Sequence, residues 1–427
     1  MLTIAKFGGT SLADGAAFRT VRELIAADPA RKGIVVSAPG RRFSGDPKVT
    51  DLLLACWTAR ENGEDWLSVW RAAAARFREI CRDLGVFPEI EGELTSIEER
   101  VHRGAPRDWL LSRGEYLTAL ILARLLGRDF IDSLRWLRFD DMGRVDTVRS
   151  YGMLRSLAQG PFVTPGFYGA MPDGTAHTFP RGGSDITGAL VAAALEADLY
   201  ENWTDVPGVL QADPRLISGA KSVEYLTYAE LAELTAVGTQ VLHEGAVQPV
   251  RDAGIPLNIR CTFRPQAPGT LILPQLPADI NRCTMLCLAG LRERTLLCLE
   301  DDRPGALASL LQAAGLQTDF QTEALGIQTA AIPSEDLDAA MEALGPHLCK
   351  VTLHDSVTLV AVIIAREETR GPLGADILAA VHHAGIPLYT VLRPFGGHTL
   401  LLAVPNSEYL KTLEALHQCA AQQEQQS

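Results

Sequence analysis

The sequence lacks a long hydrophobic run and an excess of basic residues. Its longest uncharged apolar stretch, residues 357–365, is too short to cross a bilayer. Its first residues lack the basic and apolar segments of a secretory signal. Acidic residues outnumber basic ones by 52 to 39, so the formal net charge of −13 disfavours a nucleic-acid partner. We therefore expect a cytoplasmic globular protein with no membrane or nucleic-acid partner.

The sequence also has no pair of cysteines at a spacing that is typical of metal ligands. The eight cysteines are scattered at positions 56, 81, 261, 283, 287, 298, 349 and 419. We interpret all eight as reduced, mostly buried thiols, and no residue is predicted to be a metal ligand.

The pattern of the first 200 residues is that of short strands alternating with longer helices. With 427 residues, 47% of them hydrophobic, the chain can form two or three domains with sizeable cores. Strands are expected at 3–7, 33–38, 130–133, 161–165 and 198–204, and helices at 16–27, 49–62, 65–84, 113–126 and 185–197. The alternation predicts an α/β fold with a largely parallel sheet.

The last third of the chain contains an internal repeat. A stretch rich in Pro and Gly at 264–269 indicates a domain boundary near residue 280. Beyond it, Ala-Gly-Leu at 314–316 is matched 70 residues later by Ala-Gly-Ile at 384–386, and Glu-Ala-Leu recurs at a spacing of 72. These repeats predict two small β-α-β-β-α-β units, with chance similarity of two Ala- and Leu-rich helices as the alternative.

The segment Lys6-Phe7-Gly8-Gly9-Thr10-Ser11 follows the first expected strand and opens into a helix. Two glycines let a backbone approach an anion closely, the helix start offers unpaired N–H groups, and the lysine adds a full charge. This turn is a candidate phosphate site, although a purely structural glycine turn gives the same pattern.

A second glycine-containing cluster, Arg181 to Asp185, stands directly before an apolar helix. Ser184 or Asp185 would cap that helix in a purely structural interpretation. The arginine and the two glycines are harder to explain in this way, because a guanidinium binds a carboxylate through two hydrogen bonds. Glu115, expected near the head of a helix, is favoured there by the helix dipole without any ligand.

Six motifs occur in an order typical of one family. They are Lys-Phe-Gly-Gly-Thr-Ser at 6–11, Val-Ser-Ala-Pro-Gly at 36–40, Ser-Arg-Gly-Glu at 112–115, Arg-Gly-Gly-Ser-Asp at 181–185, Thr-Asp-Val-Pro-Gly at 204–208 and Ala-Asp-Pro-Arg at 212–215. The chain resembles the aspartokinase branch of the amino-acid kinase family over nearly its whole length. The resemblance implies a three-layer αβα kinase fold over residues 1–280 and two ferredoxin-like ACT domains at 281–348 and 349–427.

The same resemblance implies ATP-dependent phosphorylation of the L-aspartate side chain, the first step to lysine, threonine and methionine. Mg²⁺ would bridge the ATP phosphates. Catalytic roles fall to Lys6 and Asp185. Substrate binding is expected from Thr50, Glu115, Arg181, Gly183 and Ser184. Nucleotide binding is expected from Lys6, Phe7, Gly8, Gly9, Ser11, Ser37, Thr204, Asp205 and Arg215.

The sequence departs from the family pattern at a few positions. Gln240 stands where a lysine is usual, and the turn at Leu210 lacks the usual tyrosine, so nucleotide binding is expected to be altered. An insertion at 41–48 carries three basic residues and is expected to be a solvated hairpin tip. The ACT units are expected either to bind lysine or threonine or to pair subunits only, in a homodimer or homotetramer.

Two rival functions stay open. A related kinase acting on glutamate, carbamate or a nucleoside monophosphate would share the fold. A catalytically idle amino-acid sensor would keep the kinase fold as a scaffold, and Gln240 and Leu210 favour that alternative.

Overall fold

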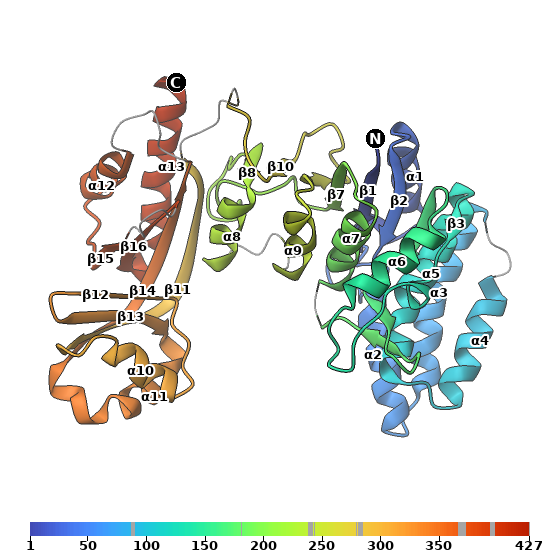
Figure 1. Ribbon diagram of the computed structural model, residues 1–427, viewed down its shortest axis with the longest axis horizontal. Coiled ribbons are helices and arrows are strands. Elements are labelled where there is room, and N and C mark those ends of the chain that lie inside the picture. Colours follow the sequence, from blue (N-terminus) through green and yellow to red (C-terminus); the bar gives the residue numbers. More distant parts are fainter. Residues whose placement is uncertain are drawn as a thin grey trace. The chain divides into compact units, whose positions relative to one another are not determined.

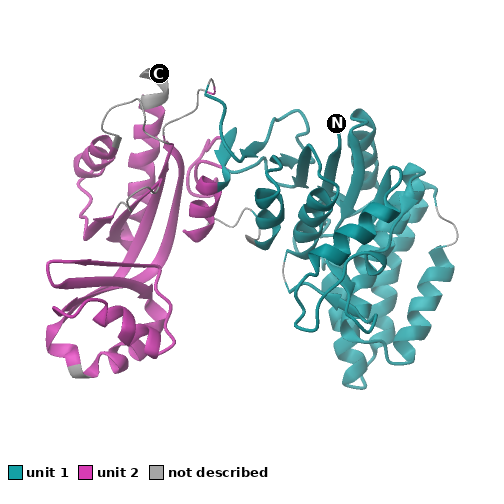
Figure 2. Ribbon diagram, viewed as in Figure 1, with its two compact units in different colours: residues 1–209, 224–228, 241–278 teal, residues 210–223, 229–240, 279–427 magenta. Residues whose placement is uncertain are grey.

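The computed structural model describes residues 1–86, 90–180, 182–237, 242, 244–278, 280, 285–365, 373–392 and 398–426 (Figure 1). The described chain forms two compact units. The first comprises residues 1–209, 224–228 and 241–278, and the second comprises residues 210–223, 229–240 and 279–427 (Figure 2). Two segments before residue 279, 210–223 and 229–240, thus belong to the second unit. The single domain boundary near residue 280 that the sequence suggests does not account for them.

An eight-stranded sheet forms the centre of the first unit, in the order β3-β4-β2-β1-β7-β9-β10-β8. Its parallel strands are β1 (Thr3–Phe7), β2 (Arg31–Val36), β3 (Asp129–Phe130), β4 (Phe162–Pro165), β7 (Leu199–Thr204) and β9 (Leu257–Cys261). At one edge, β10 (Thr270–Leu273) runs antiparallel to β9, and β8 (Tyr225–Thr227) pairs in parallel with β10. The expected α/β fold with a largely parallel sheet is confirmed.

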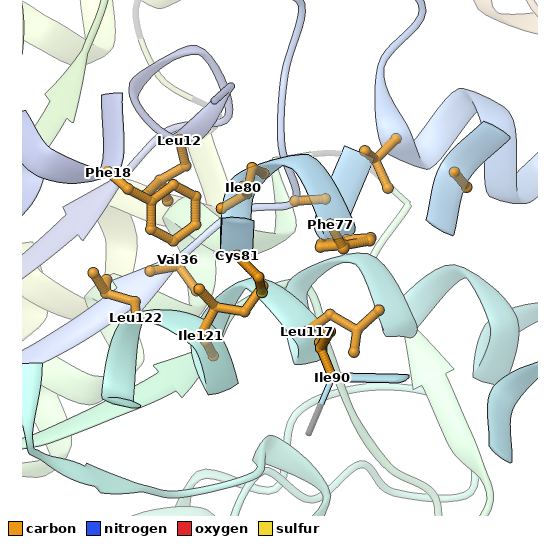
Figure 3. Packing of buried hydrophobic residues seen from close by; sticks show 14 of the residues in the cluster. Leu12, Phe18, Val36, Phe77, Ile80, Cys81, Ile90, Leu117, Ile121 and Leu122 are labelled. Atoms are coloured by element: carbon orange, nitrogen blue, oxygen red, sulfur yellow. The ribbon is translucent and has the colours of Figure 1, made fainter. Parts of the chain in front are cut away.

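Helices cover both faces of this sheet. One face packs against α1 (Gly15–Ala27), α2 (Val49–Glu61), α3 (Trp66–Leu84), α4 (Ile90–His102) and α5 (Arg107–Leu126). Figure 3 shows apolar side chains from these helices, among them Phe18, Phe77 and Ile121, packed around the strand residue Val36. The other face packs against α7 (Gly183–Ala194), with α6 (Thr147–Leu157) and α9 (Glu244–Asp252) beside it. A hairpin of β5 (Tyr168–Ala170) and β6 (Ala176–Thr178) follows β4.

The start of α5 differs from the sequence prediction. The helix begins at Arg107, after Pro106, and not at residue 113. Pro106 has extended backbone angles that suit the residue before a first turn, and the apolar residues Trp109 and Leu110 already belong to the buried face. The Ser-Arg-Gly-Glu motif therefore lies inside the helix, beyond the reach of the dipole effect at its first turn.

The second unit is built on a six-stranded antiparallel sheet in the order β12-β13-β11-β14-β16-β15. Its strands are β11 (Met285–Glu300), β12 (Phe320–Ala324), β13 (Ile327–Pro333), β14 (Val351–Ile364), β15 (Thr390–Leu392) and β16 (Thr399–Pro405). The helices that alternate with them are α10 (Ala306–Ala313), α11 (Leu337–Ala343), α12 (Leu373–His383) and α13 (Tyr409–Gln426). The order β-α-β-β-α occurs twice, and the ACT-type fold is confirmed. The repeat predicted a final strand in each unit, but among the described residues no strand follows α13.

The two halves of this sheet share their long strands. The first part of β11 pairs with the second part of β14, from Met285 opposite Ile364 to Leu291 opposite Leu359. The second part of β11 pairs with β13 and with the first part of β14. Met285 and Leu288 accordingly lie in the core beneath α12 and α13. Each repeat is completed by a strand segment from the other, so a cut between residues 348 and 349 does not separate two closed units.

The described cysteines are free thiols, and five of the seven are buried: Cys56, Cys81, Cys261, Cys287 and Cys419. Burial raises the pKa of Cys56 to about 11. Cys283 lies outside the described residues. None of the described helices is long and apolar enough to cross a membrane.

Candidate active site

A buried cation occupies the middle of the first sheet. Lys6 on β1 points to the face covered by α7, and its ammonium forms a close ion pair with the carboxylate of Asp185. Lys6 Nζ also donates to Asn202 Oδ1 at 3.3 Å, and Asn202 Nδ2 donates to Asp185 Oδ1 at 2.9 Å. The side chain of Lys6 is only 8% exposed. The three groups form a closed triangle that fixes the position of the ammonium.

The alternation of side chains along the strands explains this placement. Phe7 and Trp203, the neighbours of Lys6 and Asn202 in sequence, point to the opposite face and stack with their ring centroids 5.9 Å apart. Phe7 is fully buried there. Its expected contact with a nucleotide is therefore wrong for the side chain, and only its backbone remains available.

The glycines after β1 let two loops meet. A Cβ on Gly9 would lie 2.8 Å from the carbonyl oxygen of Ala38, and a Cβ on Gly40 would lie 2.6 Å from the carbonyl carbon of Gly9. The N–H of Gly40 donates to the oxygen of Gly9 at 2.8 Å. Gly8 lies beside Lys6: a Cβ built on this glycine would lie 3.7 Å from Lys6 Nζ. Close packing of the loops that follow β1 and β2 thus requires glycine even without a ligand.

The start of α7 is tightly packed as well. Gly182 precedes it with a φ of 61°, and a Cβ on Gly183 would lie 2.8 Å from the Cα of Phe167. Ser184 is buried against Gly166 at the end of β4. Asp185 lies in the first turn, where a carboxylate is favoured by the helix dipole. Arg181 lies outside the described residues.

A pocket of about 640 Å³ opens at the carboxyl ends of β1, β2 and β7. This edge of an open parallel sheet is where ligands of α/β proteins bind. The pocket is lined by Gly9 and Thr10 after β1, by residues 37–44, Lys48 and Thr50 after β2, by Glu115 of α5 and by Asp205 after β7. The structure thereby brings together Gly9, Ser37, Thr50, Glu115 and Asp205, which the sequence separates by nearly 200 residues.

Glu115 is the buried acid of this pocket. Its side chain is only 5% exposed. The neighbouring Gly114 lets α5 approach the loop after β2 closely, since a Cβ built on this glycine would lie 2.7 Å from Ala38 Cβ. Burial raises the pKa of Glu115 to about 8, while the backbone N–H groups of Ala38 and Glu115 lower it. Oε2 has no hydrogen-bond partner among the described residues. The alternative interpretation, a glutamate at a helix head that needs no ligand, is therefore wrong, and Glu115 offers an unpaired oxygen to a ligand.

The end of β7 contacts the turn after β1. Thr10 donates to Asp205 Oδ2 and Thr204 to Asp205 Oδ1, both at 3.2 Å. Ser11 is fully buried, and its hydroxyl lies 2.7 Å from that of Thr262. The hydroxyl of Ser11 is thus used inside the protein, in contrast to its expected contact with a nucleotide.

Two further predictions concern residues elsewhere in the chain. Arg215 belongs to the second unit, where Asp213 holds its exposed guanidinium at 2.6 Å between Nη2 and Oδ2. Gln240 lies outside the described residues.

Asn202 and Thr10 were not among the predicted site residues. An asparagine within the buried strand β7 is a signal that would have identified the first of these, since a buried amide needs partners.

Comparison with known proteins identifies the family. The family model described as the amino acid kinase family matches residues 1–261. The chain belongs to the amino acid kinase family.

Relatives within this family match almost the entire chain. Aspartokinase 3 of Bacillus subtilis is 29% identical, with 98% of each chain covered. The crystal structure of Clostridium acetobutylicum aspartate kinase is similar with 32% identity and a TM-score of 0.89, covering 98% of this chain and 99% of the other. Aspartokinase III of Escherichia coli, solved in complex with aspartate and ADP, has 25% identity and a TM-score of 0.72 at the same coverage. These three relatives, which match 98% of this chain, are aspartokinases.

Proposed function

We propose that the protein is an aspartokinase, which transfers the γ-phosphoryl group of ATP to the side-chain carboxylate of L-aspartate and forms 4-phospho-L-aspartate. The observation that carries this proposal is the buried triangle of Lys6, Asp185 and Asn202 beside the loop that lines the pocket, together with the unpaired Oε2 of Glu115 within it. Full-length similarity to aspartokinases, one of them solved with aspartate and ADP, supports the assignment.

The reaction needs no nucleophile from the protein. A carboxylate oxygen of aspartate forms a bond to the γ-phosphorus, the bond from phosphorus to the β,γ-bridging oxygen breaks, and ADP leaves with the electron pair. The acceptor is already ionised at neutral pH, so no general base is required. Positioning and charge neutralisation therefore account for most of the catalysis, as is usual in phosphoryl transfer.

Lys6 supplies the fixed positive charge in this scheme. Its ammonium is held by Asp185 and Asn202 before the substrate binds, so no reorganisation is needed when charge develops on the transferring group. Asp185 acts by orienting Lys6. The backbone N–H groups near Gly8 and Gly9 add hydrogen bonds to phosphate oxygens.

The amino-acid substrate is assigned to the pocket through its ammonium. Glu115, once ionised, binds the α-ammonium, Thr50 and Ser184 donate hydrogen bonds, and Gly183 leaves room for the ligand. Arg181 is proposed to bind a substrate carboxylate. The nucleotide is assigned to Gly8, Gly9, Ser37, Thr204 and Asp205. The assignment of Arg215 to the nucleotide rests on the sequence motif alone and stays a prediction.

Mg²⁺ is proposed to arrive with the nucleotide. In phosphoryl-transfer sites this ion is held mainly by substrate phosphates, waters and one or two carboxylates. Asp185 and Asp205 are carboxylates of the site with the right chemistry for such a ligand. Bound there, the ion would neutralise charge on the ATP phosphates.

The cellular role is also part of the proposal. The product is the entry to lysine, threonine and methionine synthesis, and we assign the reaction to the cytoplasm. Residues 1–280 are proposed as the catalytic domain and the ACT-type repeats as regulatory or subunit-pairing domains of a homodimer or homotetramer. Lysine is the first effector to test, because the similar Escherichia coli aspartokinase III has also been solved with lysine and aspartate.

A hydroxylamine trap for the acyl phosphate tests the reaction. Purified protein with ATP, Mg²⁺ and L-aspartate should form aspartyl hydroxamate, and the same mixture with L-glutamate should form little. Product with glutamate alone would favour a kinase for another acid. Absence of turnover with any amino acid, combined with tight binding of lysine or threonine, would favour the idle sensor.

A further inference from the structure

The loop between β2 and α2, residues 41–48, is part of the pocket wall. Its residues Arg41, Arg42, Phe43, Ser44 and Lys48 all line the pocket that also contains Glu115. The loop is exposed except at Asp46, as the sequence predicts, but it also forms one wall of a pocket. Three basic residues, Arg41, Arg42 and Lys48, thus lie at the pocket.

A buried ion pair holds this loop in place. Asp46 has a side chain only 3% exposed and accepts hydrogen bonds from Arg76 Nη1 at 2.9 Å and from the backbone N–H of Arg42 at 2.9 Å. Arg76, on α3, also donates to the carbonyl oxygens of Ala13 and Gly40, both at 2.9 Å. One guanidinium thus connects the turn after β1, the end of β2 and the loop.

Arg42 belongs to this anchor. Its guanidinium donates to both carboxylate oxygens of Asp46, at 3.1 and 2.9 Å, and to Glu79 at 3.0 Å. Neighbouring Arg42 and Arg76 hold the pKa of Asp46 well below its usual range. The positive charge of Arg42 is therefore balanced within the protein and is not available to a ligand.

Arg41 and Lys48 differ from Arg42 in this respect. In the part of the chain that the structure describes, neither side chain has a hydrogen bond or an ion pair, although both residues line the pocket. The other acidic lining residue besides Glu115 is Asp205, which Thr10 and Thr204 already contact. The pocket thus presents two unpaired cations and one unpaired buried carboxyl group.

This charge pattern matches an acidic amino acid, which has one ammonium and two carboxylates. If the ammonium binds Glu115, a carboxylate of the same molecule would share the pocket that Arg41 and Lys48 also line. On this basis we infer that Lys48 and Arg41 bind a carboxylate of the amino-acid substrate, and that Asp46 and Arg76 are positioning residues that hold their loop. The inference depends on the proposed function, because it assumes that an acidic amino acid enters this pocket.

Two pairs of variants test the inference by equilibrium binding of L-aspartate. Lys48→Ala and Arg41→Ala should each raise the Kd about ten- to hundredfold, the loss expected for a charge-assisted hydrogen bond. Their matched controls are Lys32→Ala, at the opposite end of β2, and Arg22→Ala, on the exposed side of α1, which should leave the Kd unchanged. In steady-state assays the KM for ATP should stay within twofold.

A triple variant tests the positioning role. Asp46→Asn should weaken aspartate binding in the otherwise unchanged protein, but it should add little in a chain that already carries Arg41→Ala and Lys48→Ala. Circular dichroism would confirm that each variant is folded. If Asp46→Asn weakens aspartate binding as much in that background as in the wild-type protein, Asp46 acts through the general stability of the fold, and its positioning role is overturned.

The remaining outcomes separate this inference from the proposed function. An unchanged aspartate Kd in both loop variants, or an effect confined to the KM for ATP, would overturn the inference. If the wild-type protein binds aspartate but forms no hydroxamate, the proposed function fails while the binding series still decides the inference. If it binds no aspartate, even with a non-hydrolysable ATP analogue, the inference is overturned as well.

Discussion

The two units of the molecule differ in how completely their buried polar side chains are hydrogen-bonded. In the described chain, the buried side-chain atoms without a hydrogen-bond partner all belong to the first unit: Thr3 Oγ1, Glu115 Oε2, Asn258 Oδ1 and Arg260 Nε. In the second unit, Gln328 is equally buried, yet it accepts from the N–H of Leu307 and donates to the carbonyl oxygens of Asp301 and Arg303.

This difference distinguishes a binding site from a structural network. A buried polar atom without a partner costs free energy, so its presence in a pocket indicates that a ligand completes it. Glu115 fits that description, because its oxygen faces a pocket with two unpaired cations. Gln328 has all its partners inside the protein and stabilises the turn before α10.

Lys6→Ala removes the fixed charge of the first unit. We expect kcat for acyl-phosphate formation to fall by about 10³-fold or more, because preorganised charge is a dominant contribution to phosphoryl transfer. The fold should persist, since Asp185 keeps its hydrogen bond from Asn202. The hydroxamate assay measures the rate and circular dichroism the fold, with Lys32→Ala as the control. Near-normal turnover would remove Lys6 from the mechanism.

Glu115→Gln tests the unpaired carboxyl group. The KM for aspartate should rise about ten- to hundredfold, because the amide cannot form an ion pair with the α-ammonium. The unfolding temperature should not fall, since the substitution removes a buried ionisable group without changing its size. A variant with unchanged KM and a large loss of stability would instead assign Glu115 to the fold.

The pH dependence of aspartate binding follows from the raised pKa of Glu115. The free site is mostly protonated below about 8, so ionisation must precede binding of the ammonium. Lowering the pH from 8.5 to 6.5 should raise the Kd roughly tenfold or more. Calorimetric titrations at several pH values measure this slope, which should be absent in Glu115→Gln. A wild-type Kd that is constant over this range would contradict the prediction.

The same shift has a defined sign for stability. The pKa of Glu115 is higher in the folded chain, at about 8, than its ordinary value of 4.5. Its contribution to the free energy of unfolding is therefore complete below pH 4.5 and is lost as the pH rises to about 8.

Gln328→Ala tests the second unit. The substitution leaves the buried N–H of Leu307 and the carbonyl oxygen of Asp301 without this partner, while the carbonyl oxygen of Arg303 still accepts from the N–H of Ala306. We expect the second unit to lose about 1–3 kcal/mol of stability. Turnover without effectors should stay within twofold. Thermal unfolding followed by calorimetry, together with the hydroxamate assay, measures both quantities. A large loss of kcat with unchanged stability would mean that Gln328 contributes to catalysis.

The sequence predicted well those features that depend on local pattern. Alternating strands and helices, glycine turns at strand ends and the internal repeat all leave local signals, and Lys6 and Asp185 lie in contact as expected for one site. The pairing of long strands leaves no such signal. The exchange between β11 and β14 pairs residues that are 68 to 79 positions apart in the sequence, so the repeat alone suggested two closed units.

Burial was the other property that local pattern did not reveal. Glu115 looked like a helix-head residue, because its burial depends on Gly114 packing against Ala38, which lies in a distant loop. The basic loop is exposed as predicted, but the burial of Asp46 could not be predicted, because its partner Arg76 lies on α3, 30 residues further along the chain. Phe7 and Ser11 belong to a ligand-binding motif by sequence, yet their side chains are used in the core.

The most direct measurement follows an oxygen atom. With ATP, Mg²⁺ and L-aspartate labelled with ¹⁸O in the side-chain carboxylate, hydroxylamine should release phosphate that carries one ¹⁸O, seen as an isotope shift in the ³¹P NMR signal. Aspartate labelled in the α-carboxylate should give unlabelled phosphate. Unlabelled phosphate from the side-chain-labelled substrate would contradict the account, because it would show that the side-chain carboxylate never bonds to the γ-phosphorus.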